Sequence, residues 1–207
     1  MEFRSRKPLD GIGTIAGRAV AVLLLPLVAL VTLVYLPFIL LSSNEKPIWW
    51  QKRPGFRGSD LRIPKFSTMN PDANGKLRET WFGKIVRPLG LDEILQIYLI
   101  AKGDMQWFGP RPIERHLLTD EYIDLVLSRT KPGFFNTRSL ITGVGNQAVF
   151  AGRVSIAEMG QFDLHDLEHW SGWHATKLFF RTALVVLRLR RYNSVPGLNA
   201  SAQEAEL

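Results

Sequence analysis

The 207-residue sequence contains no cysteine, which excludes disulfide bonds and metal sites built on thiolates. It also contains no Rossmann glycine fingerprint, no P-loop and no internal repeat. Histidine is scarce, and the most closely spaced pair is His165 and His169. This pair lacks the HExxH pattern of zinc hydrolases, so a solvated or capped pair is favoured over a zinc site.

The charge balance is basic, because 26 lysine and arginine residues outnumber 19 acidic residues and give a formal net charge of +7. Such a balance favours anionic partners, namely nucleic acid, acidic lipid headgroups or phosphorylated substrates. The basic residues are spread along the chain and no nucleic-acid-binding module is present, so we expect no nucleic-acid partner. Membrane lipid and phosphorylated substrates remain as candidates.

The longest apolar segment covers residues 19–41. At 1.5 Å per residue, a helix of this length could span a hydrocarbon core of ~30 Å. Pro26 and Pro37 lie within it, and each removes a backbone donor, so a kink or break is expected. A cleaved signal peptide is disfavoured because no small-residue cleavage site follows the segment.

Basic residues flank the apolar segment on both sides: Arg4, Arg6, Lys7 and Arg18 precede it, and Lys46, Lys52, Arg53, Arg57 and Arg62 follow it. The positive-inside rule places such residues in the cytoplasm. A helix that breaks near Pro26 and returns would keep both groups there, whereas a single spanning helix would separate them. We therefore predict that residues 1–45 form a basic N-terminal segment and a re-entrant membrane helix hairpin, with a spanning helix as the alternative.

The rest of the chain predicts a mostly helical α+β fold with short strands. Strands are expected over 48–52 and 61–66, a turn over 72–75, and helices over 92–102, 114–129 and 173–191. The last helix has a basic stripe opposite an apolar face, which is typical of an interfacial helix or of an amphipathic core helix. The polar tail at 193–207 has no periodicity and is expected to be disordered.

Two adjacent carboxylates, Asp92 and Glu93, open the predicted helix at 92–102. Acidic residues in a first turn complement the helix dipole, which explains both residues structurally. The same position would lower a carboxylate pKa, keep a nucleophile ionised and offer backbone N–H groups to phosphate. Adjacent helical residues point roughly 100° apart, so these two do not form a facing acid/base pair, but they could share Mg²⁺.

Two further motifs carry basic groups. The Gly-Pro-Arg-Pro turn at 109–112 would hold Arg111 rigidly for bidentate phosphate recognition, or for a structural ion pair with a residue such as Asp104. Arg53 and Lys65 lie in the segments 51–55 and 64–69, close in sequence to the membrane element. They could meet a diphosphate at the bilayer surface or anionic lipid.

The order of these motifs resembles the bacterial sugar transferase family, the monotopic phosphoglycosyl transferases, in a short form. The resemblance covers residues 10–192 and rests on an apolar hairpin with proline, Gln-x-Arg-x-Gly, Lys-Phe-x-x-Met, Leu-Asp-Glu-x-x-Gln, Gly-Asp-Met, Gly-Pro-Arg-Pro and a C-terminal helix. It implies transfer of a sugar phosphate from a UDP-sugar to polyprenyl phosphate, which gives a polyprenyl-diphosphate sugar and UMP. Such a reaction starts exopolysaccharide, capsule or O-antigen assembly.

The resemblance also implies roles and a location. Asp92 would be the nucleophile that forms a phosphosugar–enzyme intermediate, and Glu93 would bind Mg²⁺ together with it. The implied substrate-binding residues are Arg53, Lys65, Arg87, Gly109, Pro110, Arg111 and Pro112, and Pro26 would break the re-entrant helix. Residues 46–192 would form a phosphoglycosyl transferase domain on the cytoplasmic face of the bacterial inner membrane.

Some positions depart from the family pattern. Leu25 replaces the serine that usually precedes the helix-breaking proline, and Pro37 is a rival for that proline. The family's Pro-Gly-Ile-Thr-Gly segment is stretched over residues 132–147. A non-catalytic basic adaptor that binds anionic lipid or a protein partner is the alternative function. The sugar, the pathway and the oligomeric state do not follow from the sequence.

Overall fold

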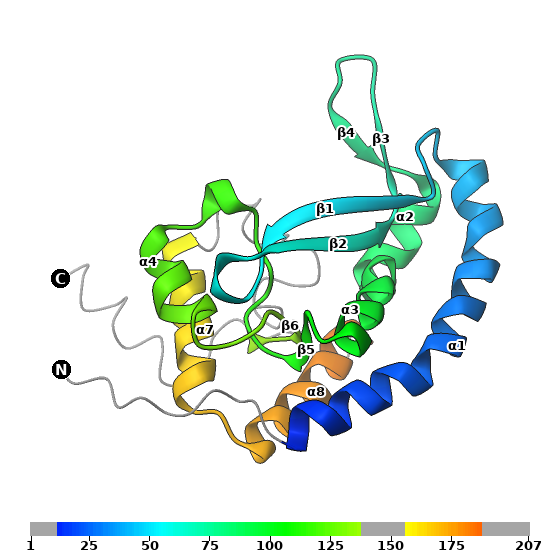
Figure 1. The fold of residues 1–207 in the computed structure, drawn as a ribbon. Helices are drawn as coiled ribbons and strands as arrows, with labels where there is room; N and C mark the ends of the chain where they lie inside the picture. Colours follow the sequence, from blue (N-terminus) through cyan, green and yellow to red (C-terminus); the bar gives the residue numbers. More distant parts are fainter. Residues whose placement is uncertain (1–11, 138–155, 188–207) are drawn as a thin grey trace.

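The computed structural model describes residues 12–137 and 156–187, and it has the mostly helical α+β fold that the sequence predicts (Figure 1). The long helix α1 (Ile12–Ser42) runs along one side of a domain built from short strands and short helices. Strands pair two at a time, as β1 with β2, β3 with β4 and β5 with β6. The side chains that follow are therefore positioned by hairpins and turns rather than by one large sheet.

Helix α1 is continuous through both prolines and bends along its length (Figure 1). The expected break near Pro26 is therefore not seen as an interruption, and the helix does not form a hairpin of two antiparallel arms. A proline removes one hydrogen bond of the helix and tilts the preceding turn. Packing of α1 on the domain before and after this turn maintains the helix on both sides of the bend.

The inner face of α1 contacts the domain near both ends. Trp107 donates its indole N–H to the carbonyl of Gly17 at 2.8 Å, and Ala21 and Val28 are buried on the side of α1 that contacts α3. Nearer its C-terminal end, Ile39 joins a second buried cluster with Phe66 of β2 and with Phe82 and Val86 of α2. The domain thus holds the beginning and the end of the same helix.

The outer face of α1 is apolar and exposed, with Leu23, Leu30, Leu33 and Leu41 each more than half accessible. The stretch from Thr14 to Ser42 is long and apolar enough to cross a membrane by length and composition, and little of it is buried. Water would solvate such a face poorly, because each exposed aliphatic side chain forfeits about 1.5–3 kcal/mol of burial. A lipid environment suits this surface.

Strands β1 (Ile48–Pro54) and β2 (Asp60–Phe66) form an antiparallel hairpin that confirms both predicted strands, with β1 two residues longer than expected. Leu61 and Ile63 alternate into the core. Lys65 lies two residues further along the same face, because side chains repeat every second residue in a strand. Arg53 is paired with Leu61 in the register, so both basic residues face the same side of the hairpin.

Strands β3 (Met69–Pro71) and β4 (Leu77–Glu79) form a projecting hairpin, and the predicted turn at 72–75 joins them (Figure 1). The Asp72 carboxylate accepts backbone N–H groups from Asn74 and Lys76 at 2.9 and 3.0 Å. Gly75 takes the positive φ of 75° that this turn requires. The hairpin leads into α2 (Trp81–Val86), where Thr80 caps the first turn by accepting from the Gly83 N–H.

The predicted helix over 92–102 is two elements. A 3₁₀ segment η3 (Leu91–Gln96) comes first, and the α-helix α3 (Ile97–Lys102) follows and ends at Gly103 with φ 92°. The preceding 3₁₀ turn η2 (Arg87–Leu89) ends at Gly90, whose left-handed backbone redirects the chain. Periodicity could not separate the 3₁₀ turn from an α-helix, because both bring residues three to four apart onto one face.

The helix predicted over 114–129 is also wrong as a single element. It consists of a 3₁₀ turn η4 (Arg115–Leu117), a turn of α-helix α4 (Asp120–Tyr122) and a π-helical segment η5 (Ile123–Leu127). Thr119 starts a new helix because its hydroxyl accepts from the Tyr122 N–H. Strand β5 (Gln106–Phe108) lies parallel to β6 (Gly133–Phe135).

The C-terminal part consists of α7 (Ile156–Glu168) and α8 (Gly172–Val186). Asp166 joins them to the rest of the domain, since it accepts from the Thr137 N–H at 2.9 Å and contacts His174 Nε2 at 3.0 Å. Helix α8 begins one residue before the prediction and is described as far as residue 187. It buries Leu178 and Thr182, as the predicted apolar face requires, and exposes Trp173 and Phe180.

Two further predictions concern the histidine pair and the C-terminal tail. The rings of His165 and His169 lie 4.1 Å apart, and the described residues contain no cluster of three or more metal-ligating side chains. The predicted disordered tail at 193–207 and most of the stretched segment 132–147 lie outside the described residues.

Candidate active site

The two carboxylates lie at the start of η3, directly after the left-handed Gly90. Gly90 ends one 3₁₀ turn and starts the next, so its left-handed backbone separates Arg87 from the dyad segment. Strand β2 contacts η3, and its Lys65 reaches Glu93. Asp92 is only 5% exposed, although nothing in its local sequence predicted such burial.

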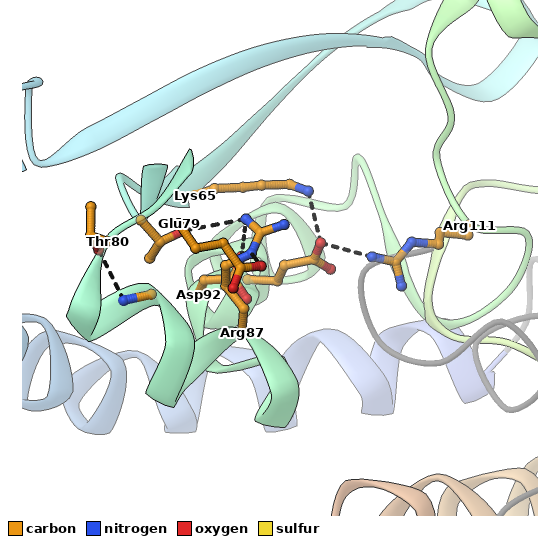
Figure 2. A network of polar contacts seen from close by, with 9 residues as sticks. Lys65, Glu79, Thr80, Arg87, Asp92 and Arg111 are labelled. Atoms are coloured by element: carbon orange, nitrogen blue, oxygen red, sulfur yellow. Dashed lines mark hydrogen bonds and ion pairs between the residues drawn. The ribbon is translucent and has the colours of Figure 1, made fainter. Parts of the chain in front are cut away.

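Glu93 is held by two cations. Lys65 Nζ lies 2.7 Å and Arg111 NH2 lies 2.8 Å from the same Oε1 atom, and they approach it from different sides (Figure 2). Gln96, one helical turn later, adds a side-chain hydrogen bond. Burial alone would raise the pKa of Glu93, but Arg111 and Lys65 outweigh this effect and lower the pKa to about 2. Glu93 is therefore ionised throughout the physiological range.

The Asp92 carboxylate has far fewer polar contacts than that of Glu93. Its one contact with a cation among the described residues is Arg87 NH1, at 3.7 Å from Oδ2, which is beyond hydrogen-bond distance. Burial, followed by the neighbouring negative charge of Glu93, raises the pKa of Asp92 to about 6. This reverses the sequence-based expectation that the helix start lowers this pKa. A short 3₁₀ segment has a weak dipole, and loss of hydration dominates at a buried carboxylate.

Arg87 links the dyad to the β3–β4 hairpin. Its guanidinium donates to Glu79 Oε1 at 3.1 Å and to Thr68 Oγ1 at 3.3 Å, and it lies beside Asp92 (Figure 2). Arg87, which the resemblance implied to be a substrate-binding residue, therefore lies beside Asp92. The partners Glu79 and Thr68 were missed, because they contact Arg87 through side chains that carry no motif.

Arg111 is positioned by two backbones that cross closely. The Gly109 N–H donates to the Phe135 carbonyl at 3.1 Å, and the Gly133 N–H donates to the Pro110 carbonyl at 2.9 Å. A Cβ atom on Gly133 would lie 2.0 Å from the Gly109 nitrogen, so only glycine fits there. The arginine of this segment pairs with Glu93, while Asp104, the alternative partner, pairs with Lys102.

Arg53 is held by a residue that the sequence did not indicate. Its NH2 group lies 2.9 Å from Glu114 Oε1, and Gln51 donates to the same atom at 2.9 Å. Glu114 follows the Gly-Pro-Arg-Pro turn by two residues, so it ties strand β1 to the segment that carries Arg111. Its proximity in sequence to Arg111 was the only available signal.

The predicted basic residues gather around one small cleft. Arg53, Lys65, Glu93, Gln96, Arg111 and Pro112 line it, together with Ile63, Gly133 and Phe134. Gly109 and Pro110 shape the turn behind the cleft. Asp92 lies next to this group because it precedes Glu93 in the chain, and Arg87 lies beside Asp92. Four segments far apart in sequence therefore bring cations to one buried carboxylate pair, which is an arrangement suited to a phosphate-bearing ligand.

The carboxylates can be tested as Mg²⁺ ligands. Mg²⁺ usually takes one or two protein carboxylates and completes its shell with water and substrate phosphate oxygens. Asp92 fits this role, because its carboxylate accepts no direct hydrogen bond from the described side chains. Glu93 fits it less well, because Oε1 already faces two cations.

Comparisons with known proteins agree with this geometry. The model of the family described as bacterial sugar transferase matches residues 12–189. The chain is 28% identical over 180 residues to a UDP-N-acetylgalactosamine-undecaprenyl-phosphate N-acetylgalactosaminephosphotransferase of Aeromonas hydrophila, with 81% of this chain and 41% of that protein covered. It is 29% identical over 199 residues to a UDP-glucose:undecaprenyl-phosphate glucose-1-phosphate transferase of Escherichia coli, with 84% and 41% covered.

A third relative is of similar length to this chain. The uncharacterized sugar transferase EpsL of Bacillus subtilis is 27% identical over 176 residues, which cover 81% of this chain and 83% of that protein. The chain thus spans about two fifths of the Aeromonas and Escherichia proteins and most of the Bacillus one. Because the family match includes α1, the dyad and α8 in one alignment, the chain belongs to the bacterial sugar transferase family.

Proposed function

We propose that this chain transfers a sugar phosphate from a UDP-sugar to polyprenyl phosphate. The observation that carries the proposal is a buried carboxylate, Asp92, which lacks a hydrogen-bond donor among the described side chains and lies near Arg87, Lys65 and Arg111. The cations would bind the diphosphate, and Asp92 would remain available to react. The relatives named for undecaprenyl-phosphate transfer favour this enzyme over a non-catalytic membrane adaptor.

The reaction would proceed in two displacements. The Asp92 carboxylate attacks the sugar-linked phosphorus, the bond from that phosphorus to the bridging oxygen breaks, and UMP leaves with both electrons of that bond. A phosphate oxygen of polyprenyl phosphate then attacks the same phosphorus and releases Asp92. When bound, Mg²⁺ neutralises phosphate charge. Arg111 and Lys65 hold Glu93 and orient the pair, while Glu93 acts as a tuning charge on Asp92.

UMP release tests this function directly. Full-length protein in detergent, with Mg²⁺ and a panel of UDP-sugars but no acceptor, should release about one UMP per active site for the correct donor. Polyprenyl phosphate should then support continuous turnover and yield a polyprenyl-diphosphate sugar. If no donor in the panel gave UMP, while the protein still bound liposomes, the adaptor would be the better explanation.

The pH dependence of UMP release should report Asp92. Because the Asp92 pKa is about 6, the nucleophile is protonated below that pH, and kcat/KM should rise from pH 5 to pH 7 with a midpoint near 6. Arg87→Gln removes a charge that lowers this pKa, so it should move the midpoint up. Glu93→Gln removes a charge that raises it, so it should move the midpoint down. Shifts of both variants in the same direction would refute the assignment.

We further propose that α1 is re-entrant in the bacterial inner membrane, with both ends and the catalytic domain on the cytoplasmic face. The support is that one polar domain contacts Gly17 and Arg18 at one end and Ile39 at the other. A spanning α1 would draw charged parts of that domain into hydrocarbon, which is costly. The bend in α1 allows the helix to enter the membrane and return to the same face. We assign this bend to Pro26.

The natural absence of cysteine makes this topology simple to test. Ser5→Cys and Lys46→Cys each introduce a single thiol on one side of α1. With a membrane-impermeant maleimide, both should be labelled only after the inner membrane is opened. Labelling of one position in intact spheroplasts would show that α1 spans the membrane.

A further inference from the structure

A second and larger cavity, of about 370 Å³, lies between the beginning of α1 and the segment that carries β5. Its apolar lining includes Ile100, Met105, Trp107 and Trp170. None of the described residues that line it also lines the cleft at the dyad. The cavity is therefore a separate feature, and the proposed reaction does not account for it.

Two cations, Arg18 and Lys131, line this mostly apolar cavity. Arg18 is fixed in place, because its guanidinium donates to the carbonyls of Ala101 and Lys102 at 3.3 and 3.2 Å. Gly103 leaves space for it, since a Cβ atom there would lie 3.1 Å from Arg18 Cζ. This arrangement holds a permanent positive charge at the wall of the cavity.

Lys131 supplies the second charge. It is half-buried, and within the described ranges 12–137 and 156–187 its ammonium group has no ion pair and no side-chain hydrogen bond. A bound anion would give this ammonium group a partner of opposite charge. Lys131 and Arg18 line the same cavity, so one anionic group could interact with both.

The position of the cavity indicates where such an anion would come from. Gly17 and Arg18 belong to the first part of α1, the helix that we place in the membrane. Basic residues near the end of a membrane helix usually lie at the level of the lipid headgroups. The cavity would therefore present its charges to lipid phosphates and its apolar walls to hydrocarbon.

We propose that this cavity binds one anionic phospholipid, with the phosphate near Arg18 and Lys131 and part of an acyl chain against Met105 and Trp107. We assign a structural lipid rather than the acceptor, because a reacting phosphate must reach the phosphorus held at Asp92, whereas this cavity shares no described lining residue with the cleft at the dyad. The inference rests on the proposed membrane placement of α1 but not on catalysis. A bound lipid there would join α1 to α3 and β5.

Lipid binding can be counted on the full-length protein. Delipidated protein in neutral detergent is mixed with phosphatidylglycerol, and bound lipid is counted by native mass spectrometry. One lipid should bind to the wild type, and Lys131→Gln should weaken that binding about fivefold, the effect of one lysine near a lipid phosphate. Lys76→Gln, an exposed lysine on the β3–β4 hairpin, is the matched control and should leave binding unchanged.

Other lipids distinguish the possible occupants. Phosphatidylcholine should bind clearly more weakly than phosphatidylglycerol, and polyprenyl phosphate should not displace the latter in a Lys131-dependent way. Equal binding by the two lysine variants, or by the two phospholipids, would overturn the proposal. Lys131-dependent displacement by polyprenyl phosphate would overturn it in favour of an acceptor site. UMP release by Lys131→Gln should stay within twofold of the wild type, which separates this result from the test of catalysis.

Discussion

Replacing Asp92 by asparagine should reduce sugar-phosphate transfer by at least about 10⁴-fold, because removal of a reacting nucleophile leaves only substrate binding and electrostatics. The UMP burst should be lost in the same variant, since no phosphosugar–enzyme intermediate can form. A donor labelled in its sugar should leave covalent label on the denatured wild type and none on Asp92→Asn. Asp60→Asn is the matched control, because Asp60 is exposed and pairs with Lys52 across the β1–β2 hairpin.

The same substitution should not cost stability. A pKa raised from 3.8 to about 6 means that the folded protein holds the proton of Asp92 more tightly than the unfolded chain. This contribution to stability is present below pH 3.8 and is lost as the pH rises through 6. At pH 7–8 the ionised carboxylate is therefore the less favourable state, and a neutral asparagine should leave the unfolding midpoint equal or higher. Normal turnover of this variant, or a folding defect, would contradict the assignment.

Replacing Gly133 by alanine should lower the unfolding midpoint by about 5 °C or more. The added methyl group would lie 2.0 Å from the Gly109 nitrogen and 2.5 Å from its Cα, and both are backbone atoms that cannot move aside cheaply. Overpacking of this kind typically costs about 1–3 kcal/mol, and 1 kcal/mol corresponds to roughly 2–4 °C in a chain of this size. Thermal unfolding in detergent measures the effect.

The Gly133 variant should also lose activity, because the same crossing positions Arg111 against Glu93. Gly172→Ala is the matched control, since a Cβ atom there meets nothing within 4 Å. It should leave both the midpoint and UMP release unchanged. An unfolding midpoint for Gly133→Ala within 1 °C of the control value would show that the two loops can separate without cost.

Local patterns predicted the elements that depend on neighbours in sequence. The strands at 48–52 and 61–66, the turn at 72–75 and the end of α3 at Gly103 were expected from the sequence, whereas the pairing of the two strands as a hairpin came from the structure. The segments 92–102 and 114–129 were each predicted as one helix, but each consists of more than one helical element. In the second segment Thr119 caps a new helix, and in the first the 3₁₀ segment passes into α-helix between Gln96 and Ile97 without a capping side chain; neither boundary changes the apolar period.

The site was predicted in part. The resemblance assigned Asp92, Glu93, Lys65, Arg87 and Arg111 to one site, and in the structure these side chains lie in contact with one another. The resemblance did not reveal Glu114 as the partner of Arg53, because that contact joins residues 61 positions apart through a side chain without a motif. The sequence also did not predict that α1 would bend without a break, because packing against the domain near both ends maintains the helix.

The sequence by itself determined that the chain has an apolar helix with basic flanks, a paired carboxylate at a turn and a family to compare it with. Only the tertiary structure decided how the two carboxylates differ. Strand β2 and the Arg111 loop bring two cations within 2.8 Å of Glu93 and leave Asp92 buried with a distant one, so their pKa values move in opposite directions. The physical reason is that ionisation depends on desolvation and on charges from other segments, and these exist only after the chain has folded.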